Sequence, residues 1–294
     1  MKVLTSPRIR EDRGVKSLLE TINVISGVRT VLAEFTDLIE APNWTQDGKH
    51  LVYNSNGHIY TFDLETQQAC EIYSGFAVDC NNDHVLSPDG KQIAVSHRTL
   101  EDGLSRIYTL PLTGDEPTLI TPIAPSYLHG WSPDGNVLAY CGERNGQYDI
   151  YTIPVKGGTE TQLTDLPSLD DGPEYAPSGK DIWFNSTRTG LMQVWRMERD
   201  GTNPTQITFD EANNWFPHVS PDGNLITFIS YNKDDVPPNS HPANKNVEIR
   251  LMSAKGGLAR TIAKLFGGQG SLNVNSWSPD NKTIAFVSYK LKTT

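Results

Sequence analysis

Cysteine is scarce in this sequence, and no apolar stretch is long. Three cysteines, Cys70, Cys80 and Cys141, stand far apart among 294 residues and form no Cys-x-x-Cys pair. Neither a disulfide framework nor a zinc site is therefore indicated. No apolar run approaches the roughly 18 residues that a membrane-spanning helix requires, so we expect no insertion into a membrane.

Positive charge is also in short supply. Asp and Glu outnumber Lys and Arg by 35 to 25, which gives a formal net charge of −10. An acidic surface repels phosphate backbones, so nucleic acid is not an expected partner. Residues 1–13 lack the apolar segment of a secretory signal. We expect a cytoplasmic protein, or a periplasmic one if a signal peptide has been removed.

Common catalytic motifs are absent as well. The sequence contains no Gly-x-Ser-x-Gly, no His-Glu-x-x-His and no Gly-rich phosphate-binding loop. Its Asp-Gly pairs and Gly267-Gly268 are typical of turns. We therefore do not favour an enzyme, and we expect no resident cofactor other than a divalent metal in one interpretation given below.

One turn, in contrast, is repeated along the whole chain. Counted from Asp47, Asp89, Asp134, Ser178, Asp222 and Asp280, variants of Ser-Pro-Asp-Gly recur at steps of 42, 45, 44, 44 and 58 residues. A fixed period in this range is typical of a repeat architecture. The last step contains an insertion, 233–245, rich in Pro, Asn and Asp. Pro-Asp-Gly itself predicts a tight turn between two strands.

Around this turn each repeat has short alternating runs of β-branched and aromatic residues, which predict four strands. Residues 18–34 align without a gap on the second half of the third repeat, and the sixth repeat stops after its first half. The sequence thus predicts an all-β, six-bladed propeller of four antiparallel strands per blade, closed by N- and C-terminal half-repeats that share one blade. We expect one domain over 1–294, with residues 1–14 as a loose arm.

The repeat resembles that of the TolB-type β-propellers, a WD-like repeat family. The resemblance is carried by Trp131–Gly135, Tyr148–Ile153 and Thr161–Thr164, and it covers nearly the whole chain. It implies a binding protein with a protein or peptide partner. It also implies a periplasmic protein whose propeller follows an α/β domain, for which this sequence has no room. Peptidase propellers and oligogalacturonide lyases share the repeat, so it selects no activity.

A polar position recurs four or five residues before each turn. It is occupied by Asn43, His84, His129, Glu174, His218 and Asn275. Ring closure would bring these residues round one mouth of the central channel. Three interpretations are open: a hydrated polar lining, a site for a small anionic or sugar ligand, and a divalent metal held by His84, His129, Glu174 and His218. The polar residue stands four residues before the turn position in some repeats and five in others. This difference weighs against the metal, because successive residues of a strand face opposite sides of the sheet.

Further candidates lie on the same face. Tyr127 and Trp215, with Phe216 and Asp170-Asp171, are candidates for a binding rim. Three arginines end the second strand of their repeats; they are Arg98, Arg144 and Arg188. They are interpreted either as bridges between neighbouring blades or as convergent anion ligands. Asn81, Asn82 and Asp83 are interpreted as turn formers.

The favoured function is a non-enzymatic scaffold that engages a protein, a peptide or a small ligand over the loop-rich face and the channel mouth. The alternative is a carbohydrate-active enzyme similar to an oligogalacturonide lyase, with histidines, an arginine and a metal at the channel mouth.

Overall fold

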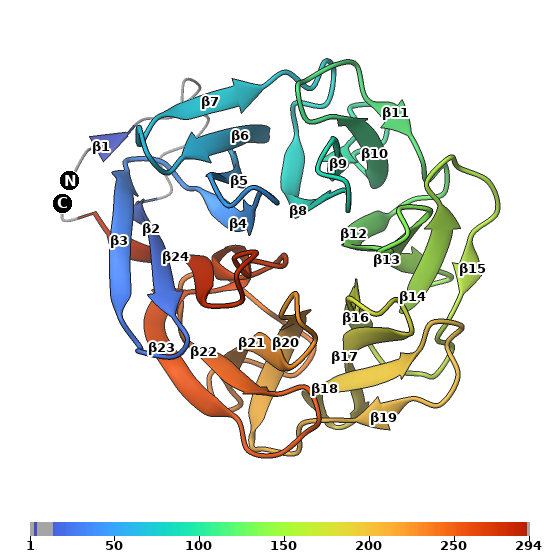
Figure 1. The fold of residues 1–294 in the computed structure, drawn as a ribbon. Helices are drawn as coiled ribbons and strands as arrows, with labels where there is room; N and C mark the ends of the chain where they lie inside the picture. Colours follow the sequence, from blue (N-terminus) through green and yellow to red (C-terminus); the bar gives the residue numbers. More distant parts are fainter. Residues whose placement is uncertain (1–2, 5–13, 293–294) are drawn as a thin grey trace.

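The computed structural model describes residues 3–4 and 14–292. In this part of the chain, strands form six four-stranded sheets arranged round a central axis (Figure 1). The predicted six-bladed β-propeller is confirmed. No helix among the described residues is long and apolar enough to cross a membrane.

Blades 1 to 5 each take four consecutive strands, from the innermost to the outermost. Blade 1 comprises β4 (Glu40–Trp44), β5 (His50–Ser55), β6 (His58–Asp63) and β7 (Ala69–Ile72); blade 2 comprises β8 (Cys80–Leu86), β9 (Gln92–Arg98), β10 (Ser105–Pro111) and β11 (Thr118–Leu119). Blade 3 comprises β12 (Ser126–Trp131), β13 (Val137–Arg144), β14 (Gln147–Pro154) and β15 (Thr161–Gln162). Blade 4 comprises β16 (Asp170–Tyr175), β17 (Asp181–Thr189), β18 (Leu191–Glu198) and β19 (Thr205–Gln206); blade 5 comprises β20 (Ala212–Val219), β21 (Leu225–Asn232), β22 (Lys245–Ser253) and β23 (Arg260–Gly267).

Blade 6 joins the two ends of the chain, as predicted. Its strands lie in the order β24 (Thr283–Leu291), β2 (Val15–Asn23), β3 (Arg29–Phe35) and β1 (Val3–Leu4). In Figure 1 the blue strands β2 and β3 lie beside the red β24. β2 and β24 pair antiparallel over nine residues, from Val15↔Leu291 to Asn23↔Thr283. The ring is thus closed by a full-length ladder rather than by a loose contact.

Two details of blade 6 differ from the prediction. Its innermost strand is reduced to one bridge, Trp277↔Ile284. At the outer edge β1 pairs in parallel with β3, so Val3–Leu4 are an edge strand rather than part of a loose arm. The rest of the predicted arm, except Gly14, lies outside the described residues.

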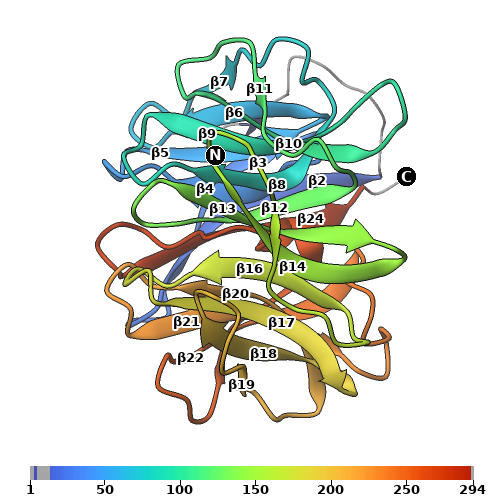
Figure 2. The same cartoon turned by 90° about the vertical axis from the view of Figure 1, so that its right-hand side faces the viewer.

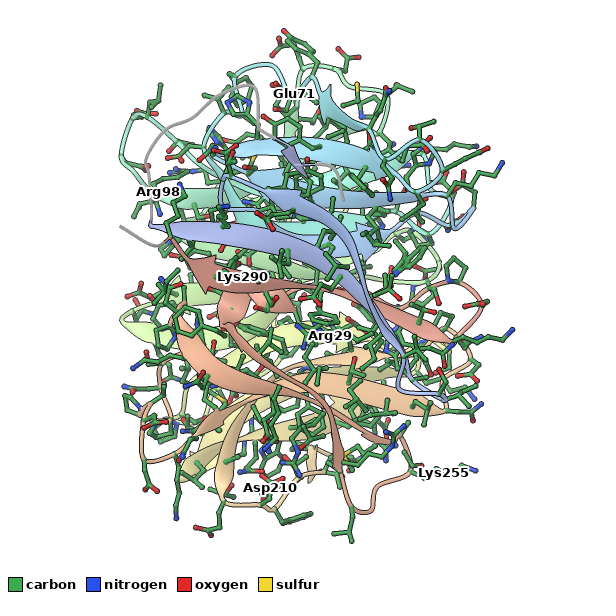
Figure 3. All side chains as sticks on the ribbon, turned by 90° about the vertical axis from the view of Figure 1, so that its left-hand side faces the viewer. Arg29, Glu71, Arg98, Asp210, Lys255 and Lys290 are labelled. Carbon is green, nitrogen blue, oxygen red and sulfur yellow. The ribbon has the colours of Figure 1, made fainter. Side chains whose placement is uncertain are left out.

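The strand directions give the propeller two different faces. The turns between first and second strands and between third and fourth strands share one end, the turn face. The hairpins between second and third strands and the connections between blades share the other, the loop face. Figure 2 shows the blades from the side, and Figure 3 places Arg98 and Lys255 at opposite edges of the molecule. This agrees with Arg98 ending β9 and Lys255 lying in the turn after β22.

The repeated turn is held by its own side chains. In blade 3, Asp134 Oδ1 accepts hydrogen bonds from Ser132 Oγ at 2.6 Å and from the Asn136 amide at 3.0 Å. The hydrogen bond from Ser132 is the main reason why the pKa of Asp134 is lowered. Gly135 has φ 76°, a conformation that a side chain would strain. The same Ser–Asp bond recurs in blades 2, 5 and 6.

The hydrophobic core lies between neighbouring sheets. One cluster joins Phe35 of blade 6 to Tyr53 and Phe62 of blade 1, with Phe35–Tyr53 ring centroids 5.4 Å apart. Another joins blades 4, 5 and 6 through Met192, Trp215 and Phe286. Because each blade buries both faces, loss of one blade would expose the cores on either side of it.

Residues 268–276, the channel segment, cross the middle of the ring (Figure 1). They include the single-turn 3-10 helix η1 (Gln269–Ser271). Leu272, Asn273 and Val274 are fully buried. Asn273 Nδ2 donates to Asp83 Oδ1 of blade 2 at 2.7 Å, and the Ser276 hydroxyl donates to the Pro42 carbonyl of blade 1 at 2.6 Å. The segment therefore fills the channel instead of leaving it open.

Leu19→Ala should test whether blade 6 is part of one cooperative unit. Leu19 is fully buried, lies on β2 opposite Val287 and belongs to the core shared with blade 1. Its truncation should lower the free energy of unfolding by about 2–5 kcal/mol, as for other buried leucines. Val31→Ala, on the half-exposed side of β3, is the control and should cost less than about 1 kcal/mol. Equal effects in chemical denaturation would contradict closure by this blade.

Candidate functional site

Each innermost strand of blades 1 to 5 contains a β-bulge. The pairing register shifts between Glu40 and Asn43, Cys80 and His84, Leu128 and Gly130, Asp171 and Glu174, and Trp215 and His218. A bulge changes the direction in which the following side chains point. Residues before the bulge, such as Asp171, line a cavity on the loop face, whereas residues after it, such as Glu174, line one on the turn face.

The loop-face cavity has a volume of about 870 Å³. Its outer walls are hairpin residues: Gly57 of blade 1, Leu104 of blade 2, and Asn239 and His241 from the insertion of blade 5. Its inner wall carries acids and amides from several blades; they are Glu40, Asp79, Asn81, Asn82, Asp83, Asp171 and Gln269. The lining is therefore polar, and its four acids outnumber its one arginine.

His129 and Asp171 form an ion pair at the base of this cavity. His129 Nε2 lies 3.2 Å from Asp171 Oδ1, and the imidazole stacks on the Phe216 ring at 5.5 Å. Burial alone would lower the pKa of His129, but the carboxylates of Asp171 and Asp83 outweigh burial and raise it. Burial acts to raise the pKa of Asp171, and His129 more than offsets this, so that pKa is lowered.

Two more titratable groups border the pair. Asp83 is 2% exposed, and burial raises its pKa although His129 and the amide of Asn273 act in the opposite direction. His241 Nε2 lies 3.9 Å from Asp171 Oδ2. Burial lowers the pKa of His241, partly offset by Asp171. Asp83 was interpreted as a turn former, but it is a buried residue of β8 that faces a cavity.

The turn-face cavity is smaller, about 500 Å³. Its wall is built from the residue before each turn, namely Trp44, Leu86, Trp131, Tyr175, Val219 and Trp277. At its floor, Glu174 Oε1 accepts from the Val219 amide and from Asn275 Nδ2, both at 2.8 Å. Glu174 Oε2 lies 2.7 Å from His218 Nδ1. This floor is a hydrogen-bonded polar network beneath a largely apolar wall.

The six polar positions expected in one ring are divided by the bulges. Asn43, Glu174, His218 and Asn275 form one network, because Asn43 Nδ2 also donates to the Asn275 carbonyl and His218 Nε2 lies 3.2 Å from the Leu272 carbonyl. His129 borders both cavities. His84 is fully buried, and burial lowers its pKa to about 4. A single ring of all six at one mouth was therefore wrong.

The four expected metal ligands are separated in the same way. Glu174 and His218 are hydrogen-bonded to each other, His129 pairs with Asp171, and His84 lies apart from both pairs. Within residues 3–4 and 14–292, no three His, Cys, Asp or Glu side chains are grouped so that they could share a metal ion.

Of the three aromatic rim candidates, Tyr127 lines a cavity, whereas Trp215 and Phe216 are fully buried. Tyr127 is half-buried beside His129 in the wall of the loop-face cavity. Trp215 is fully buried and packs against His241, a residue of the cavity wall, with the two ring centroids 4.4 Å apart. Trp215 therefore positions a cavity residue rather than forming a rim.

The recurrent arginines brace single blades. Arg144 makes two hydrogen bonds to Glu160, at 2.9 and 2.8 Å, within blade 3. Arg188 pairs with Asp170 at 2.7 Å within blade 4 and lies over the Trp195 ring. Only Arg98 borders the loop-face cavity, 3.9 Å from Asp79. Arg144 and Arg188 therefore neither bridge neighbouring blades nor converge on one anion.

Sequence reasoning missed Asp83, His241 and Asn273 as cavity or channel residues. His241 had one usable signal, because it lies in the insertion that interrupts the repeat. The bulges also had a signal: a proline precedes the polar residue in Ala41–Asn43, Gly172–Glu174 and Phe216–His218. Ala41, Gly172 and Phe216 all have φ between 53° and 63°. Proline and a left-handed residue together indicate interrupted strand pairing.

The His129–Asp171 pair predicts a pH dependence of stability. A raised histidine pKa stabilises the fold fully below the unfolded value of about 6.5, and this contribution declines as pH rises through the folded pKa. The lowered pKa of Asp171 makes the pair effective above about pH 4. His129→Gln should therefore destabilise the protein more at pH 5.5 than at pH 9. The measurement is urea denaturation at both values. In an Asp171→Asn background the excess destabilisation at pH 5.5 should become smaller, because only Asp83 then favours the charged imidazole; an unchanged pH difference there would contradict the pairing.

Comparisons with known proteins agree with this architecture. Residues 121–245 match the family model described as the TolB beta propeller domain. The uncharacterized protein Atu1656 of Agrobacterium fabrum is 44% identical over 276 residues, which are 94% of this chain and 93% of that protein. A solved structure of a TolB candidate from Agrobacterium tumefaciens is 44% identical, with a TM-score of 0.90 over 94% of this chain and 99% of that one.

More distant relatives are longer than this chain. The Tol-Pal system protein TolB of Francisella tularensis subsp. tularensis is 28% identical over 261 residues, which are 85% of this chain but only 57% of that protein. The chain thus spans little more than half the length of the relatives named for the Tol-Pal system. On the high identity and near-complete coverage of the Agrobacterium relative, together with the matched domain, this chain belongs to the TolB-type β-propeller family.

Proposed function

We propose that the protein is a non-enzymatic binding scaffold that engages a protein or peptide segment over its loop face and within the loop-face cavity. The observation that carries this proposal is the cavity of about 870 Å³. Its size is in the range of binding pockets, and its walls come from hairpins and connections, where binding residues are commonly placed on a rigid scaffold. Acceptor groups of several blades converge there.

Exposed apolar side chains surround the same face. They are Phe76, Leu100, Leu104, Ile123, Leu166 and Phe209, which lie in connections between blades or in the β9–β10 hairpin. Single exposed apolar residues are common on protein surfaces. Six of them on the face that bears the larger cavity support a protein partner, since apolar contacts around a polar pocket are typical of interfaces.

The charge of the cavity supports a partner with hydrogen-bond donors or positive charge. Glu40, Asp79, Asp83 and Asp171 line it, against Arg98 and two histidines. Acidic walls repel a small anion and a polyuronide chain alike. We therefore do not favour the anionic ligand or the oligogalacturonide lyase, and no specific contact supports a neutral sugar or a metal-dependent reaction.

Family membership adds a cellular context to the proposal. The Francisella relatives are named for the Tol-Pal system, and the TolB resemblance implies a periplasmic location. The polar residues 1–13 led us to expect the cytoplasm. The family membership leads us to favour the periplasm instead. A partner of the kind that TolB-type propellers engage would meet the loop face there.

Site-specific photo-crosslinking tests the proposal. A benzoylphenylalanine at Leu104, beside the cavity, should capture a discrete protein in cells of the native host, whereas one at Ile25, exposed on the turn face, should not. Asp83→Asn combined with Asp171→Asn should weaken the captured complex by about ten- to a hundredfold, because charge-assisted hydrogen bonds are lost. Capture from both faces alike, or none from Leu104, would contradict the proposal. So would release of unsaturated uronides with added Mn²⁺, measured in the ultraviolet.

A further inference from the structure

Asp83 is a buried acid of the loop-face cavity that has no ion pair of its own within the described chain: the nearby cationic group, His129, pairs with Asp171 and acts on Asp83 only through its charge. Its carboxylate accepts hydrogen bonds from two amides: Asn273 Nδ2 donates to Oδ1 at 2.7 Å, and Asn81 Nδ2 donates to Oδ2. Among the described residues it makes no ion pair with Lys or Arg, whereas Asp79 lies near Arg98 and Asp171 pairs with His129. Each carboxylate oxygen can accept one hydrogen bond more.

A buried carboxylate of this kind is costly. Removing a charge from water is unfavourable unless a partner of opposite charge replaces the lost hydration. The raised pKa of Asp83 reflects this burial, and the groups facing it are His129 and Asp171 with the amides named above. His129 is already engaged by Asp171. An entering cation would complete the compensation that His129, shared with Asp171, and the two amides give only in part.

Two tyrosines line the same cavity as this carboxylate. They are Tyr127 and Tyr148 of blade 3, and the charge of Asp83 is one cause of the raised pKa of Tyr127, after burial. Aromatic faces attract organic cations. A carboxylate held in place by two amide NH2 groups, in a cavity that phenol rings also line, is suited to an ammonium group.

A metal ion fits these surroundings less well. Divalent cations are usually held by several oxygen or nitrogen ligands, more than one of them charged. In the part of the chain that the structure describes, no cluster of three such groups is present. An ammonium needs only two or three acceptors and gains from aromatic neighbours that a hydrated metal ion cannot use.

We propose that the loop-face cavity binds an alkylammonium group at Asp83, supplied by a lysine side chain or the amino terminus of the partner segment. This inference rests on the proposed function for the source of the ammonium, and it adds the chemical group that the site recognises. Asp83 acts as the charge partner, Tyr127 and Tyr148 flank the alkyl chain, and Asn273 holds the carboxylate in place from the channel segment.

Titration with n-butylammonium chloride tests the site without any partner protein. Followed by NMR at pH 8, the wild type should show saturable binding in the millimolar range, and 1-butanol, its neutral counterpart, should bind at least tenfold more weakly. Asp83→Asn keeps the shape and removes the charge, and it should weaken n-butylammonium at least tenfold. Asp79→Asn removes another carboxylate of the same cavity and should change affinity by less than threefold.

Tyr127→Leu provides a second variant that leaves the carboxylate intact, and it should weaken n-butylammonium about three- to fivefold. Absence of saturable binding would overturn the inference. Equal binding of 1-butanol would also overturn it, because binding would then depend on apolar contact and not on charge. Equal losses of affinity from Asp83→Asn and Asp79→Asn would overturn it too, because binding would then depend on the overall charge of the cavity and not on Asp83. Binding of Ca²⁺ in competition with n-butylammonium would replace the ammonium with a metal and so contradict it.

The outcome is distinguishable from that of the proposed function. If n-butylammonium binds as described but no protein is captured beside Leu104, the ammonium site stands and the peptide scaffold fails. If a protein is captured and its affinity does not respond to Asp83→Asn alone, the scaffold stands and the ammonium site fails. The source of the ammonium group is identified by replacing lysine with glutamine in the captured segment. A loss of affinity assigns the group to the lysine side chain, and an unchanged affinity assigns it to the amino terminus.

Discussion

The nine-residue ladder between β2 and β24 is the constraint on which the rest of the structure depends. It joins the N-terminal and C-terminal strands within one sheet. Around it, Glu20 accepts two hydrogen bonds from Arg29 and one from Ser288, so three segments of blade 6 are tied together at a nearly buried carboxylate. Because every blade packs against two neighbours, this closure holds the inner strands in the circle that creates both cavities.

The inner circle then acquires its chemistry from departures from the repeat. A regular inner strand would present alternate residues to the channel along its whole length. The bulges divide each strand into a part that faces the loop side and a part that faces the turn side. The channel segment fills the space between them and adds Asn273 to Asp83 and the Leu272 carbonyl to His218. Two cavities of different character result, one acidic and one walled by aromatic residues.

Charge is managed differently in the two regions of the molecule. Near the ends of the blades, carboxylates such as Glu160 and Asp170 are matched by arginines that also lie over aromatic rings. Such pairs fix the blade edges. In the loop-face cavity the acids exceed the fixed cations, and Asp83 is hydrogen-bonded by amide side chains instead of an arginine. The contrast is the physical basis for assigning recognition to this cavity and bracing to the arginines.

The sequence by itself determined the fold and its closure, because both follow from local signals that repeat. Pro-Asp-Gly specifies a turn wherever it occurs, alternating β-branched and aromatic residues specify strands, and the fit of residues 18–34 to half a repeat specifies how the ends meet. Only the tertiary structure decided the site. The six polar positions look equivalent in the sequence, but one extra residue in an inner strand turns its successors to the other side, so that Glu174 and Asp171, three positions apart, serve different cavities. Asp83 is hydrogen-bonded by Asn273, 190 residues away in the sequence, and is influenced by the charge of His129 in the neighbouring blade. No local sequence pattern encodes such contacts, because they exist only once the ring has closed.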